Sequence, residues 1–132
     1  MQMLSGNEDF PTLLFNTIKK NKVISIIGLS KNVSKTTTLN HIINILRDKQ
    51  TFGVTSIGRD GEPYDTITQL PKPKIIVEKG TIFATAEDSL NNSDIKTELL
   101  KTTEFTTPLG IINIYKALTK GYVELAGPSM NY

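Results

Sequence analysis

The chain has 132 residues, of which 38% are apolar and 21% charged, and it contains no cysteine. These values are typical of one soluble globular domain, and they exclude disulfides, thiolate metal sites and cysteine nucleophiles. Fifteen basic and thirteen acidic residues give a net charge of +2, which does not by itself indicate a nucleic-acid-binding surface. The sequence shows no secretory signal and no apolar run of the ~20 residues that a membrane span needs. We therefore expect a cytoplasmic protein that binds neither membranes nor nucleic acid.

The first half of the chain has the pattern of a parallel α/β unit. Residues 9–20 carry apolar side chains three and four positions apart, which predicts a short amphipathic helix. Residues 22–27 are an apolar, β-branched run before Gly28, typical of a strand buried on both faces. A helical stripe over residues 39–49 and a strand over residues 51–57 follow. Strand, loop, helix and strand in about 35 residues is the length of a βαβ unit with parallel strands.

The second half predicts antiparallel additions to that unit. Residues 74–77 and 81–85 flank a Glu-Lys-Gly turn and predict a hairpin. Residues 94–102 predict a helix capped by Asp94. Two strands are expected over residues 110–115 and 122–125, with a turn at Lys120 and Gly121. The fold class expected is α/β, with a P-loop-like three-layer architecture and one domain over residues 1–132.

The segment that points to a function is residues 28–37, Gly-Leu-Ser-Lys-Asn-Val-Ser-Lys-Thr-Thr, between a predicted strand and a predicted helix. A helix N-terminus exposes unpaired N–H groups and the positive end of its dipole, and a phosphate chain supplies acceptors for them. Lys35 can reach the β and γ phosphates, the Thr36 hydroxyl can join the shell of a Mg²⁺ ion, and Thr37 can contact the α phosphate. The candidate phosphate-binding residues are Gly28, Lys31, Asn32, Val33, Ser34, Lys35, Thr36 and Thr37.

The loop departs from the pattern G-x-x-x-x-G-K-[ST] in two ways. Five residues rather than four separate Gly28 from Ser34, and Ser34 replaces the glycine before the lysine. A side chain at that position can crowd the loop or strain it. Two alternatives therefore stay open, a solvated helix start that is capped by threonine, and a loop that binds phosphate without turnover as part of a non-catalytic interaction module.

Asp60 is the candidate catalytic and metal-binding carboxylate, together with Lys35 as the catalytic cation. It follows the second predicted strand in a Gly-Arg-Asp-Gly turn. Ligands of open α/β sheets bind at the carboxyl ends of strands, so Asp60 is expected near Lys35 and Thr36, where it would hold Mg²⁺ or position a water. The alternative is a turn aspartate that bonds its own backbone. Arg59 is more consistent with a solvated arginine than with a phosphate contact, and His41 falls off the apolar stripe and is expected at the surface.

A P-loop protein usually carries a further acidic residue after a third parallel strand, and residues 75–132 contain no convincing aspartate of this kind. Either Asp60 acts alone, or that part of the sheet is missing from the chain. An incomplete sheet has an exposed edge that can pair with another chain. A homodimer is therefore one expected assembly.

The spacing from Gly28 to Thr36 resembles the variant loop of dethiobiotin synthetase and its relatives, which belong to the class of MinD-like and signal-recognition P-loop proteins. Lys31 lies one residue away from a second lysine that is common in that class. Six segments, the loop included, recur in this order in one family: residues 28–40, 55–62, 72–75, 84–86, 107–110 and 123–129. The chain is similar over nearly all of its length after Lys22 to the ATPase-like subunit of the reactivating factor for lysine/ornithine aminomutases.

That resemblance implies ATP rather than GTP as the nucleotide, with Mg²⁺, and an ATP-driven exchange of damaged cobalamin. It implies two protein partners, a second subunit of the reactivating factor and an aminomutase that uses adenosylcobalamin and pyridoxal phosphate. Members of that family extend further at the C-terminus, so the resemblance implies an N-terminal portion or a shortened relative. A glycine usually precedes the loop lysine in that family, so Ser34 bears on hydrolysis more than on binding.

Overall fold

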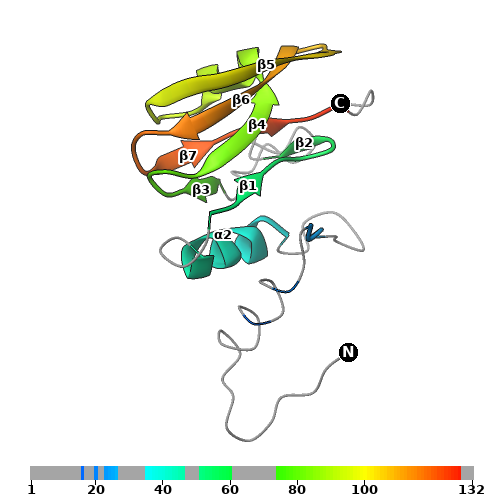
Figure 1. Ribbon diagram of the computed structural model, residues 1–132. Helices are drawn as coiled ribbons and strands as arrows, with labels where there is room; N and C mark the ends of the chain where they lie inside the picture. The colour runs from blue at the N-terminus through cyan, green and yellow to red at the C-terminus, as the bar shows by residue number, and fades with distance from the viewer. Residues whose placement is uncertain are drawn as a thin grey trace, which may run out of the picture.

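The computed structural model describes Asn16, Lys20 and residues 23–26, 35–46, 51–60 and 74–128. These residues form a mixed α/β fold with mainly strands and few helices (Figure 1). The helix predicted over residues 9–20 lies outside the described residues except for Asn16 and Lys20.

The largest sheet has four strands in the order β1-β4-β6-β5, and only β1 and β4 run parallel. Its strands are β1 (Gly53–Val54), β4 (Ile82–Ala86), β5 (Thr97–Thr107) and β6 (Gly110–Ala117). Two short antiparallel pairs adjoin it, formed by β2 (Arg59–Asp60) with β8 (Leu125–Ala126) and by β3 (Ile75–Val77) with β7 (Gly121–Val123). The described helices are α2 (Lys35–Leu46) and the short 3-10 helix η1 (Glu87–Asn92).

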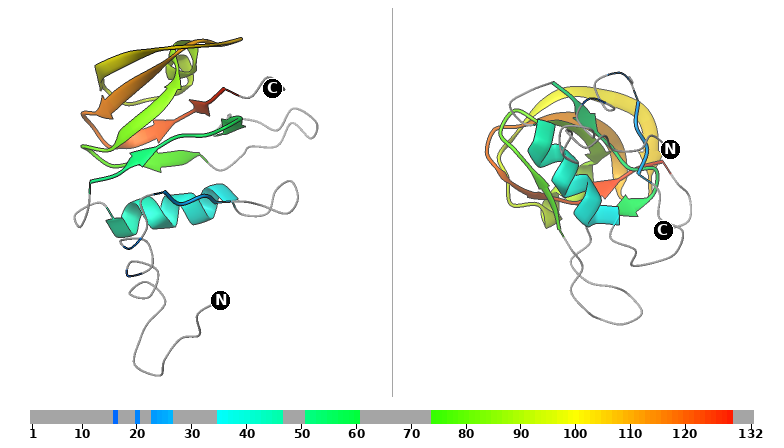
Figure 2. Two further views of the ribbon diagram at one scale, coloured as in Figure 1. Left: turned by 45° about the vertical axis from the view of Figure 1, so that its right-hand side comes forward. Right: turned by 90° about the horizontal axis from the view of Figure 1, so that it is seen from below.

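Helix α2 forms over the predicted apolar stripe and lies as a layer beneath β1 and β3 (Figures 1 and 2). Ile43 and Leu46 are buried, whereas His41 is exposed, as its place off the stripe predicts. Asn40 fixes the helix on β3 and on Lys74, the residue before it, with two hydrogen bonds. Its Nδ2 donates to the Lys74 carbonyl at 2.7 Å, and its Oδ1 accepts from the Ile76 N–H at 2.8 Å. The Asn40 amide thus pairs with β3 as the backbone of a neighbouring strand would.

The buried strand predicted over residues 22–27 is wrong for the part that the structure describes. Residues 23–26 form no strand, and the Val23 side chain is 85% exposed. The parallel neighbour of β1 is β4 instead, and the predicted strand over residues 51–57 is reduced to the two residues of β1. An apolar β-branched run has strand propensity, but only a ladder partner makes it a strand. The described residues therefore do not form the predicted βαβ unit.

The predicted hairpin over residues 74–85 is wrong as well, because β3 and β4 do not pair with each other. They run along β7 and β6 in one unchanged register, from Ile75 opposite Val123 to Ile82 opposite Lys116. Gly80, with a φ of 92°, turns the chain at the bend between them, where its N–H donates to the Ala117 carbonyl at 2.8 Å. The Glu-Lys-Gly turn therefore joins strands of two different sheets, and the Thr81 N–H donates to the Glu78 carbonyl at 3.1 Å within it.

The helix predicted over residues 94–102 is wrong, because residues 97–102 belong to a strand and residues 94–96 lie before it. Residues 97–107 form β5, which pairs with β6 through a tight turn before Gly110. Asp94 caps no helix, because its Oδ1 accepts the Tyr122 N–H at 2.7 Å. The spacing of Ile95, Leu99 and Leu100 suits a helix, but the threonine-rich end of the segment and the adjacent β6 favour a strand. Tertiary pairing overrides the local pattern here.

The strands predicted over residues 110–115 and 122–125 are confirmed, with β6 two residues longer and the second divided at Glu124 into β7 and β8. The core joins α2 to all three sheets. The Phe83 and Tyr115 rings pack with centroids 5.6 Å apart at one register pair of β4 and β6. The buried core cluster consists of Ile43, Val54, Ile75, Val77, Phe83, Tyr115, Ala117, Val123 and Leu125.

Candidate functional site

The first candidate site is the start of α2. Lys35, Thr36 and Thr37 occupy the first turn of this helix, with Lys35 and Thr37 exposed and Thr36 half-buried. The first turn contains no acidic residue, and the first N–H groups of a helix have no acceptor within it. This end of α2 is therefore suited to an anion. The other predicted loop residues, Gly28, Lys31, Asn32, Val33 and Ser34, lie outside the described residues.

Asp60, the second candidate residue for this site, is described only by its backbone. It belongs to β2 and lies opposite Leu125 of β8, and its side chain is not among the described parts of the chain. Figures 1 and 2 show β2 on the same side of the domain as the first turn of α2. The strand that ends at Asp60 thus runs antiparallel to β8, and not beside a strand over residues 22–27 as the sequence predicts.

The described residues contain no group of three or more His, Cys, Asp or Glu side chains that could hold a metal ion. A Mg²⁺ ion at a nucleotide needs no such group. It keeps several waters and takes one or two protein oxygens together with phosphate oxygens. The hydroxyl of Thr36, in the first turn of α2, suits that role.

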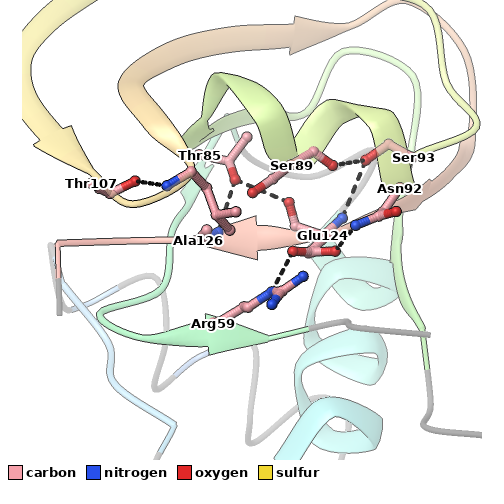
Figure 3. A network of polar contacts seen from close by, with 9 residues as sticks. Arg59, Thr85, Ser89, Asn92, Ser93, Thr107, Glu124 and Ala126 are labelled. Carbon is pink, nitrogen blue, oxygen red and sulfur yellow. Dashed lines mark hydrogen bonds and ion pairs between the residues drawn. The ribbon is translucent and has the colours of Figure 1, made fainter. Parts of the chain in front are cut away.

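The second candidate site is a buried network around Glu124, which lies at the break between β7 and β8 (Figure 3). Its side chain is 0% exposed. The Arg59 Nε donates to Glu124 Oε1 at 2.7 Å, and Asn92 Nδ2 donates to Oε2. Both carboxylate oxygens therefore have a donor, and the charge of Glu124 is matched by that of Arg59.

The backbone of Glu124 is also fully bonded. Its N–H donates to Ser93 Oγ at 3.2 Å, and its carbonyl accepts from Thr85 Oγ1 at 3.0 Å. The same Thr85 oxygen accepts the Ala126 N–H at 2.8 Å. The network thus ties β2, β4, η1 and β8 together around one carboxylate.

The chemical role of this carboxylate follows from its burial. A buried charge is tolerated only when it is paired and hydrogen-bonded, and removing one partner of a buried pair costs about 3–5 kcal/mol. Glu124 therefore holds the Arg59 guanidinium in one place. The expectation that Arg59 is simply solvated is wrong, because its side chain is only 32% exposed and is bonded through Nε.

Sequence reasoning did not single out Glu124. The sequence feature that could have identified it is a single carboxylate between Val123 and Leu125 in an otherwise apolar run. Both neighbours are fully buried in the structure. A charge flanked by core residues on a short strand points to a buried partner. Arg59, 65 residues earlier in the chain, could not be identified as that partner from spacing.

No protein-family model matches the chain, and neither the curated proteins nor the solved structures include a significant match to it. Neither of the helices that the structure describes is both long and apolar enough to cross a membrane. The proposal that the chain binds a nucleotide therefore rests on the chain's own residues.

Proposed function

We propose that this protein binds a Mg²⁺–nucleoside triphosphate, with the phosphates at the N-terminus of α2. The observation that carries the proposal is that α2 begins at Lys35, directly after the Gly28–Ser34 part of the loop. Lys35, Thr36 and Thr37 thereby share the first turn of the helix, whose N–H groups have no acceptor within the helix itself. ATP is proposed over GTP because of the resemblance to the aminomutase reactivating factor.

Each residue of this turn has a distinct proposed role. Lys35 places a positive charge on the β and γ phosphates, which lowers the energy of the charge that develops when the γ phosphate leaves. The Thr36 hydroxyl binds Mg²⁺, and the Thr37 hydroxyl and N–H bind the α phosphate. Asp60 completes the metal shell through a water or directly. These assignments belong to a P-loop-like three-layer fold, which we propose for the whole chain.

The resemblance also leads us to propose a role in reactivating an adenosylcobalamin-dependent aminomutase. In that role, ATP binding and hydrolysis drive the exchange of damaged cobalamin, together with a second subunit. The test is the recovery of activity in an inactivated aminomutase, with wild-type protein and with the variant Lys35→Ala. Equal recovery with both proteins would remove this part of the proposal and leave nucleotide binding standing.

A second copy of the chain is a further proposed partner. β5 is the outer strand of the four-stranded sheet, and Leu99, Leu100 and Phe105 on it are 56%, 44% and 66% exposed. Outer strands with exposed apolar side chains tend to pair with other chains. Sedimentation at high protein concentration tests this proposal, since a strictly monomeric profile contradicts a homodimer.

Calorimetric titration of Mg–ATP tests the nucleotide proposal. Wild-type protein should bind with a saturable heat, and Lys35→Ala should lose roughly 10- to 100-fold in affinity, as expected for a lost charge-assisted contact. Lys79→Ala is the matched control, because Lys79 is an exposed lysine in a turn of the same chain. Equal heats for wild type and Lys35→Ala would overturn the proposal.

Binding without turnover is the second candidate, and Ser34 in place of glycine favours it. Phosphate release from ATP distinguishes the two. Release that disappears in Lys35→Ala would rule out the non-catalytic module. Binding without release would support it, and Ser34→Gly is then the variant expected to gain turnover.

A further inference from the structure

The contact between Arg59 and Glu124 uses only part of the arginine. Nε donates to the buried carboxylate at 2.7 Å, whereas the two Nη atoms have no hydrogen-bond partner among the residues that the structure describes. About one third of the Arg59 side chain is exposed, at 32%, while that of Glu124 is completely covered. The arginine is thus anchored at its inner nitrogen (Figure 3), and about one third of its side chain is exposed.

Neutralising Glu124 does not by itself need an arginine. A lysine ammonium supplies one positive charge and up to three donors, which is enough for one carboxylate oxygen. An arginine adds a planar fork of Nη donors whose geometry matches two oxygens of a phosphate group. Holding the guanidinium by Nε pre-orders this fork, so less conformational entropy is lost when an anion binds.

The backbone beside Arg59 is fixed by a hydrogen bond to the end of β8. Gly127 N–H donates to the Gly58 carbonyl at 2.7 Å, which ties the residue before Arg59 to the end of β8. The Arg59 guanidinium is therefore presented from a fixed stretch of backbone.

We infer that the Nη atoms of Arg59 bind a phosphate oxyanion, and that Glu124 is the positioning residue that holds the guanidinium for it. Two compounds can supply such an oxyanion: inorganic phosphate, and the nucleotide proposed above through its terminal phosphate. Only the second source rests on the proposed function.

The test uses side-chain NMR of the arginines together with three variants. The chain has two arginines, Arg47 and Arg59, so Arg47→Lys assigns the signals and is the matched control. Arg59→Lys keeps a positive charge for Glu124 but removes the fork. Inorganic phosphate, Mg–ATP and Mg–ADP are titrated separately against wild type, both arginine variants and Lys35→Ala.

Saturable shifts of the wild-type Arg59 resonances, with affinity reduced roughly 10- to 100-fold in Arg59→Lys and unchanged in Arg47→Lys, support the inference. If inorganic phosphate is the source, Lys35→Ala binds it like wild type. If the nucleotide is the source, Arg59→Lys weakens Mg–ATP but leaves Mg–ADP within about twofold of wild type, because ADP lacks the terminal phosphate.

Three results contradict the inference or separate it from the nucleotide proposal. Arg59 resonances that respond to neither phosphate nor Mg–ATP overturn it, and this readout does not depend on any variant folding. Equal affinities of Arg59→Lys and wild type for every ligand overturn it as well. Loss of Mg–ATP binding in Lys35→Ala, combined with wild-type binding in Arg59→Lys, leaves the nucleotide proposal intact and removes only the role of Arg59.

The positioning role of Glu124 has its own readout. Glu124→Gln keeps an acceptor for Arg59 but removes the charge that holds the guanidinium. The Arg59 Nε–H signal should then exchange faster with solvent, and phosphate affinity should fall while the Arg47 signal stays unchanged. An unchanged Arg59 signal in Glu124→Gln would show that the carboxylate does not position the arginine.

Discussion

The start of α2 and the network around Glu124 differ in how their polar groups are used. In the first turn of α2, Lys35 and Thr37 are exposed, and the helix start has N–H groups without helical acceptors. Around Glu124, both carboxylate oxygens and both backbone groups have partners from β2, β4, η1 and the segment after it. The first region presents exposed polar side chains at a helix start, and the second uses buried polar groups to join strands.

This difference predicts how substitutions separate stability from binding. A change in a satisfied, buried network leaves partners without hydrogen bonds and lowers the free energy of unfolding. A change at an exposed helix start leaves the fold intact and alters only the affinity for a ligand. Arg59 belongs to both classes, because Nε is part of the network and the Nη atoms are not.

The largest effect on stability is expected for Glu124→Ala. Removing the carboxylate leaves the Arg59 charge and the Asn92 amide without their partner, so the free energy of unfolding should fall by about 3–5 kcal/mol. Denaturant unfolding measures it, with Glu124→Gln as a control that keeps the size and an acceptor. A loss below about 1 kcal/mol in Glu124→Ala would mean that the network does not hold the strands together.

A smaller loss is expected for Thr85→Val. The substitution is nearly isosteric, but it removes the acceptor of the buried Ala126 N–H and the donor to the Glu124 carbonyl, at about 1–3 kcal/mol. Thr85→Ser keeps the hydroxyl and should retain these bonds. If Thr85→Val and Thr85→Ser unfold at the same denaturant concentration, the hydroxyl has no structural role.

Asn40→Ala tests how α2 is held on the sheet. It removes the two hydrogen bonds to β3, and a loss of roughly 1–2 kcal/mol is expected because the site is only half-buried. Asn44→Ala lies one turn later on the exposed side of the same helix and should change the free energy of unfolding by less than about 0.5 kcal/mol. Equal losses in both variants would point to helix propensity rather than to the bonds with β3.

Sequence patterns predicted some elements correctly and failed where a distant partner outweighs the local pattern. The stripe that ends at Leu46 predicted α2, and residues 110–115 were correctly predicted as a strand, β6. The segment at Leu99 has helical spacing but pairs with β6, and the run at Val23 has strand propensity but no ladder. In these two segments, tertiary context outweighed propensity.

The same distinction applies to the sites. Lys35 could be proposed from sequence because the predicted phosphate loop is contiguous in the chain and precedes a predicted helix. The Glu124 network could not, because Arg59, Thr85, Asn92 and Glu124 come from four separate places in the sequence. Only the fold brings them together.

Equilibrium unfolding with and without saturating Mg–ATP tests the central claim, that the start of α2 binds a nucleotide. Without ligand, wild type and Lys35→Ala should unfold within about 0.5 kcal/mol of each other, because Lys35 is exposed. At a ligand concentration of about 100 times the wild-type Kd, wild type should gain about 2.7 kcal/mol and Lys35→Ala far less. Equal gains in both proteins, or no gain in wild type, would contradict a nucleotide site at Lys35.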